Sequence, residues 1–79
     1  MKEIQLYTDD AEPEIREIRL LGYGTPADRK VEVLLTNGTT VTITALYEGF
    51  QQTGCTKREA AVTVDVALRF SGYLHGKAL

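Results

Sequence analysis

Four carboxylates lie within six residues near the start of the chain, and their side chains could bind a cation or a basic surface. They are Asp9, Asp10, Glu12 and Glu14. Their positions lack the ligand spacing of a calcium-binding loop, and Pro13 restricts the backbone where such a loop needs freedom. Complementary charge speeds and orients the association of proteins. These residues therefore predict a docking site for a protein partner with a basic surface, and the alternative is a solvated turn between two strands.

A second candidate site consists of basic side chains in the C-terminal part of the chain. Its main members are Arg29, Lys30, Lys57 and Arg58, with Arg69 further along. Small barrels that bind single-stranded nucleic acid combine a positive groove with aromatic side chains on which bases stack. The aromatic residues here are Tyr7, Tyr23, Tyr47, Phe50, Phe70 and Tyr73. If the basic residues share one face, this pattern predicts a nucleic-acid-binding barrel; otherwise the aromatic residues serve core and edge packing.

The single cysteine, Cys55, is a candidate nucleophile. The neighbouring cations of Lys57 and Arg58 would favour its thiolate, but a cysteine nucleophile also needs a positioned base. The one histidine, His75, lies near the C-terminus of the sequence. One cysteine and one histidine are also too few for a typical zinc site. We therefore expect no catalytic residues, no metal and no cofactor, and a chain that is not an enzyme.

The glycine-rich segment Gly22-Tyr23-Gly24-Thr25-Pro26-Ala27 matches the pattern of dinucleotide-binding sites. That motif holds a pyrophosphate because a helix N-terminus follows it immediately. Here Pro26 and Asp28 precede a strand-like segment, so we expect the glycines to serve a turn.

Length and composition indicate one small globular domain over residues 1–79. Charged residues make up 25% of the chain, and the formal net charge is −2. Residues 1–28 hold three basic and seven acidic side chains, whereas residues 29–79 hold six basic and four acidic ones. A lone cysteine excludes an internal disulfide, and no apolar run has the length of a signal peptide or a membrane span. These features predict a protein of the reducing cytoplasm that does not contact a membrane.

Two strands are predicted in the N-terminal part of the chain. Lys2–Thr8 places Ile4 and Leu6 on one face of a short strand, which the acidic segment then interrupts. The next segment, Ile15–Tyr23, fits a second strand. A helix over Ala11–Leu21 has matching apolar spacing, but it would be short, so we favour the strand.

The segment Lys30–Thr44 has the pattern of a β-hairpin about Asn37-Gly38, a strong hairpin signal. A two-residue loop would place valines opposite threonines, and a slip of one residue turns a whole apolar face to water. We therefore favour a three-residue loop, Thr36–Gly38, with Gly38 in the left-handed region. The expected pairs are Val33 with Val41 and Val31 with Ile43.

Three further segments complete the prediction. Ala45–Thr53 fits a short helix that Gly54 ends. Apolar and polar residues alternate along Ala61–Phe70, which is typical of a half-buried strand, and its polar residues leave no polar face on a helical wheel. Thr56–Glu59 has the spacing of a helix capping box, but the strand expected after it favours a turn.

Together these segments predict a mainly β fold: a small antiparallel sheet or open barrel of four or five strands with one short helix. The alternative is an α+β fold, in which Ala11–Leu21 or Thr56–Leu74 forms a longer helix across the sheet.

A chain this small, with an acidic loop and no catalytic set, resembles the compact accessory proteins of phages, anti-CRISPR proteins among them. The resemblance implies an inhibitor in the host cytoplasm that covers a working surface of a protein or nucleoprotein effector. The acidic loop would then imitate nucleic-acid phosphates on a basic channel. The alternatives are a small nucleic-acid-binding β-barrel and an enzyme subunit completed by oligomerisation, and the oligomeric state stays open.

Overall fold

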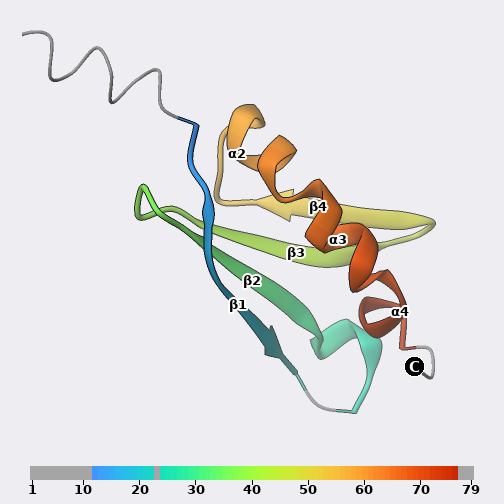
Figure 1. Ribbon diagram of the computed structural model, residues 1–79. Helices are drawn as coiled ribbons and strands as arrows, with labels where there is room; N and C mark the ends of the chain where they lie inside the picture. Colours follow the sequence, from blue (N-terminus) through green and yellow to red (C-terminus); the bar gives the residue numbers. More distant parts are fainter. Residues whose placement is uncertain (1–11, 23, 77–79) are drawn as a thin grey trace, which may run out of the picture.

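The computed structural model describes residues 12–22 and 24–76, and it forms a sheet with helices on one face (Figure 1). Along the chain the elements are β1 (Ile15–Leu21), the 3-10 turn η1 (Pro26–Asp28), β2 (Lys30–Leu35), β3 (Thr40–Leu46), β4 (Gly49–Thr53), α2 (Lys57–Val62), α3 (Val64–Arg69) and α4 (Ser71–Leu74). The four strands are antiparallel and follow one another in chain order, so β1 and β4 are the two edges. The predicted strand Lys2–Thr8 lies outside the described residues.

The β2–β3 hairpin confirms the predicted register. Val33 pairs with Val41 and Val31 pairs with Ile43, and all four side chains are fully buried against the helices. Leu35 N donates to the carbonyl oxygen of Thr39, which leaves a loop of three residues between the strands. Gly38 has a φ of +92°, as expected for the left-handed position of such a loop.

Strand β1 confirms the strand favoured for this segment and excludes the helix over Ala11–Leu21. Ile18 pairs with Val33 and Leu20 pairs with Val31, with a bulge near the start of the strand. Paired residues in an antiparallel ladder share a face, so Ile18 and Leu20 point to the helix side of the sheet. Six of the seven residues of β1 are nevertheless exposed.

The short helix predicted over Ala45–Thr53 is wrong. Strand β3 continues to Leu46, the chain turns at residues 47 and 48, and Phe50 of β4 pairs back with Ala45. Glycine in a helix interior is unfavourable, so Gly49 weakens the helix that the apolar spacing had suggested. The strand gains a paired backbone and places Phe50 against the core.

The strand predicted over Ala61–Phe70 is also wrong, because residues 57–74 form the three helices. The buried positions Glu59, Thr63, Ala67 and Leu74 recur at helical spacing, and the backbone of Ala67 donates to Thr63 O across one turn. Glu59 and Thr63 are polar although they are buried, so the polar residues of this segment do not gather on one exposed face of the helices. Leu68, which the predicted strand would have buried, is 60% exposed.

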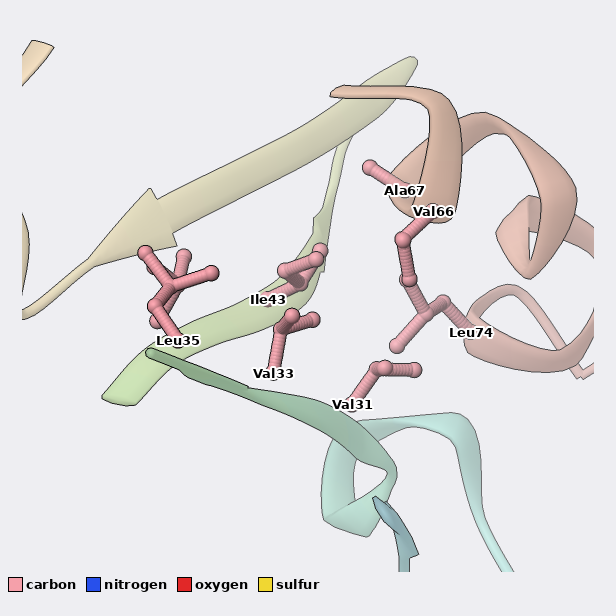
Figure 2. Close-up of a cluster of buried hydrophobic side chains, with 8 residues drawn as sticks. Val31, Val33, Leu35, Ile43, Val66, Ala67 and Leu74 are labelled. Carbon is pink, nitrogen blue, oxygen red and sulfur yellow. The ribbon is translucent and has the colours of Figure 1, made fainter. Parts of the chain in front are cut away.

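The hydrophobic core lies between the sheet and the helices (Figure 2). Its sheet side is formed by Val31, Val33, Leu35, Val41 and Ile43, and its helix side by Val66, Ala67 and Leu74. The open four-stranded antiparallel sheet is thus confirmed, whereas the single short helix is wrong. The alternative with helix over Thr56–Leu74 describes the arrangement better, with the helix divided at Thr63 and Phe70.

Candidate functional site

The described part of the acidic segment lies where the chain enters β1. Glu12 and Glu14 are exposed, and Pro13 between them is buried. The backbone of Glu14 is held at both ends, since its N–H donates to Oγ1 of Thr36 at 3.0 Å and its carbonyl accepts from Thr36 N at 2.9 Å. We call Glu12 and Glu14 the acidic corner. The other two predicted site residues, Asp9 and Asp10, lie outside the described residues.

The four basic residues of the alternative site do not come together. Arg29 and Lys30 lie at the start of β2, whereas Lys57 and Arg58 lie in the first turn of α2, which is tied to the hairpin at the far end of β2. The six residues of β2 span about 20 Å. Two basic pairs at opposite ends of a strand do not form the continuous positive groove that single-stranded nucleic acid requires.

Arg29 serves the fold. Its guanidinium donates to the carbonyl oxygens of Tyr73 at 2.9 Å and Gly24 at 3.2 Å, and it lies 5.1 Å from the centre of the Tyr73 ring. The Tyr73 hydroxyl in turn donates to Leu21 O at 2.7 Å. These contacts fasten α4 to the loop between β1 and β2. The same loop needs Gly22, because a Cβ there would lie 2.2 Å from the carbonyl oxygen of Asp28.

The uncovered face of the sheet carries threonines and charged side chains together with three leucines, Leu21, Leu34 and Leu46. One of its two central strands, β3, presents Thr40, Thr42 and Thr44, which alternate with the buried residues of that strand. Phe50, Phe70 and Tyr73 pack against the core on the other side, and Tyr47 lies on the β3–β4 turn. Among the described residues, therefore, this face offers no aromatic platform on which bases could stack. Tyr7 and Tyr23 lie outside the described residues.

The turn expected over Thr56–Glu59 is wrong, because the capping box forms and its carboxylate also anchors the helices to the sheet. Glu59 is only 8% exposed, and its Oε2 accepts hydrogen bonds of 2.7 Å from Asn37 Nδ2 and from Thr39 Oγ1. Its Oε1 accepts from Thr56 N at 2.8 Å, and Thr56 Oγ1 accepts from Glu59 N, which completes the capping box. Hydrogen bonds to the charged form, first from the Thr56 backbone, lower the pKa of Glu59 to about 2.

A second polar contact missed by the sequence interpretation joins β4 to the helices. Gln52 Nε2 donates to Thr63 Oγ1 at 2.6 Å and to Ala60 O at 2.7 Å. Thr63 is fully buried, and its hydroxyl lies 3.1 Å from Ala60 O. The helical spacing from Glu59 to Thr63 was the available signal, but only the partners on the sheet explain why these polar residues can be buried.

The thiol and imidazole considered for catalysis lie in structural positions. Burial raises the pKa of Cys55, and the negative charge of Glu59 raises it further, so the thiolate is disfavoured at neutral pH. A ring nitrogen of His75, Nε2, lies 2.8 Å from Gly49 O, which joins the end of α4 to β4. Within residues 12–22 and 24–76 no group of three or more histidine, cysteine, aspartate or glutamate side chains could hold a metal ion.

Comparison with protein-family models, with curated proteins and with solved structures finds no match for this chain. Across the described residues, no helix is long and apolar enough to cross a membrane. Three surface features remain from which a function can be inferred: the acidic corner, the uncovered face of the sheet and the exposed edge strand β1.

Proposed function

We propose that this chain is a non-enzymatic protein-interaction module that docks on a basic protein surface through the acidic corner. The observation that carries the proposal is the backbone of Glu14, which two hydrogen bonds with Thr36 hold in place while both corner side chains stay exposed. Charges carried on a fixed backbone lose less conformational freedom on binding than charges on a free tail. Complementary charge also raises the association rate.

The use of the other polar groups supports a binding role. Arg29, Gln52, Glu59, Thr63 and His75 carry the groups most suited to chemistry, and each makes a hydrogen bond that joins two elements of the fold. Catalysis needs such groups to converge on a substrate. Because these groups hold the fold together, the features left for function are the exposed charges and the exposed edge strand.

The narrower form of the proposal is an inhibitor of the anti-CRISPR type, which covers a basic channel of a protein or nucleoprotein effector. The acidic imbalance of residues 1–28, with seven acidic and three basic side chains, supports this form, because a basic channel that binds phosphates also attracts carboxylates. Asp9 and Asp10 extend the charge of the corner along the sequence. The effector itself is a matter for experiment.

The test begins with capture of partners on the tagged full-length chain from a lysate of its native host, with and without nuclease treatment. Recovery of the same protein after nuclease treatment is the expected result. Association kinetics are then measured for the Glu12→Gln/Glu14→Gln variant and for the fourfold variant with Asp9→Ser and Asp10→Ser. Both should associate more slowly and with a weaker dependence on salt.

A matched control is the variant Glu48→Gln/Asp65→Asn, which removes the same amount of charge from two exposed positions away from the corner. It should bind like the original chain. The proposal is wrong if the corner variants keep the original rate and salt dependence, or if capture is lost with the nucleic acid. The second result would favour nucleic-acid binding that involves Lys30, Lys57 and Arg58.

A further inference from the structure

Strand β1 is an edge of the sheet with apolar side chains in contact with solvent. Ile15, Leu20 and Leu21 are 39%, 47% and 36% exposed. An edge strand also leaves backbone N–H and C=O groups without ladder partners, which makes it a template for another strand. The strand contains no proline, and beyond the bulge at its start its register is regular from Glu17 to Leu21. The combination indicates a surface that another β-strand covers.

The charges of β1 identify the kind of strand that fits. Glu17 pairs with Leu34 and Arg19 pairs with Glu32, so both charged side chains lie on the uncovered face of the sheet. Arg19 Nε and Glu17 Oε2 are 2.9 Å apart along the strand. Ile18 lies between them on the opposite face, beside the core. Along the strand, Ile18 thus lies between a negative and a positive side chain. When an identical strand runs antiparallel, each negative side chain faces a positive one.

From this pattern we propose that two copies of the chain associate through β1, antiparallel and with Ile18 at the two-fold axis. In this register Glu17 of each copy faces Arg19 of the other, and the two Ile18 side chains meet on the helix side. Glu32 of β2 already lies beside Arg19, so charges alternate across the junction. The two four-stranded sheets become one continuous sheet.

Charge excludes the neighbouring registers. Because side chains alternate between faces, the pairing can shift only so that residues of the same face stay opposite one another. One such shift places Glu17 opposite Glu17 of the second copy, and the other places Arg19 opposite Arg19. Like charges directly opposite one another destabilise a strand pair. The register centred on Ile18 therefore avoids both repulsions. This proposed dimer goes beyond the docking on a basic protein and does not involve the acidic corner.

The test uses two charge reversals on the full-length chain, Glu17→Arg and Arg19→Glu, and measures mass by sedimentation and light scattering over a range of concentrations. The original chain should form dimers reversibly as the concentration rises, because one strand pair is a small interface. Each single variant should stay monomeric, since it places like charges opposite one another twice. An equimolar mixture of the two variants should dimerise again, because arginines then face glutamates. The double variant Glu17→Arg/Arg19→Glu should also dimerise.

Glu48→Arg is the matched control, because it makes the same change of charge at an exposed turn away from β1 and should leave the dimer intact. Hydrogen exchange of β1 amides should slow with rising concentration in the original chain. The proposal is overturned if the mixture of variants stays monomeric, or if the single variants dimerise like the original. A monomer at every concentration overturns it as well. In that case slow exchange in β1 would indicate that another segment of the same chain covers the edge, and fast exchange would indicate an edge open to a different partner.

Discussion

Oε2 of Glu59 accepts a hydrogen bond of 2.7 Å from Nδ2 of Asn37, and this contact joins the first turn of α2 to the tip of the β2–β3 hairpin. Thr39 donates to the same oxygen at 2.7 Å. The sheet and the helix layer are thus linked through one carboxylate at the end of the molecule where the acidic corner also lies. Several properties of the protein should depend on that link.

Acid should weaken the fold through Glu59. Its pKa is lowered to about 2 in the folded chain from an ordinary value of 4.5, so the charged form stabilises the fold fully above about pH 4.5. That contribution is lost as pH falls from about 4.5 to about 2. Glu59→Gln should therefore be less stable than the original chain at pH 7, and the difference should shrink across this range. Urea unfolding at a series of pH values measures it, with exposed Glu48→Gln as control; a difference that stays constant with pH would contradict the prediction.

Gly38 should tolerate substitution poorly for reasons of backbone conformation alone. A Cβ at Gly38 would meet nothing within 4 Å, but its φ of +92° disfavours any L residue. Gly38→Ala should cost about 1–2 kcal/mol in the free energy of unfolding, and Gly38→Val more. Gly49 is the matched control, because a Cβ there also enters open space and its φ is ordinary. Gly49→Ala should change stability by less than about 0.5 kcal/mol, and equal effects at the two positions would exclude this explanation.

Neighbouring residues at the junction of α2 and α3 should lose unequal amounts of stability when a charge is introduced. Thr63 is fully buried, so Thr63→Asp would place an uncompensated charge beside the Gln52 amide and cost at least about 3 kcal/mol. Val64 is half-buried at the start of α3, and Val64→Asp should cost only about 1 kcal/mol. Thermal unfolding of the two variants tests the helical assignment directly, because a strand would bury Val64 and expose Thr63.

Cys55 should react slowly with thiol reagents in the folded chain. Burial and the charge of Glu59 raise its pKa, and the thiolate is the reactive species. Alkylation by iodoacetamide at pH 7.5 should be slower than for a free cysteine, and the rate should recover in urea. A rate above that of free cysteine would instead indicate an activated nucleophile. Cys55→Ser should leave partner binding unchanged.

The pattern of the sequence was sufficient for the sheet where apolar alternation coincided with burial. In β2 and β3 every buried position is apolar, so the choice between two loop lengths fixed the register of Val31 and Val33. The same reasoning failed at residues 61–70, where Val62, Val64 and Leu68 are not buried and Thr63 is. Thr63 can be buried there because Gln52 of β4 donates to its hydroxyl, and no local pattern contains that partner.

The candidate site was predictable only in part for a related reason. Exposed charge can be read from composition, so the acidic residues were visible as a group. Whether residues far apart in the sequence come together cannot be read in that way. Lys30 begins β2, whereas Lys57 begins α2 beside the hairpin at the other end of β2, although both were assigned to one patch. The symmetry of β1 about Ile18 has meaning only once β1 is known to be an edge.

The alternation along Val62–Phe70 has a consequence for the unfolded chain. In the native protein this segment is helical because Glu59 and Thr63 are held by the sheet. Once those hydrogen bonds are lost, the same residues favour extended structure, with valines, leucine and phenylalanine on one side. Such a segment readily pairs with copies of itself. Acid or heat that releases the helices should therefore lead to aggregation into β-rich fibrils, so refolding should succeed best from dilute solution near neutral pH.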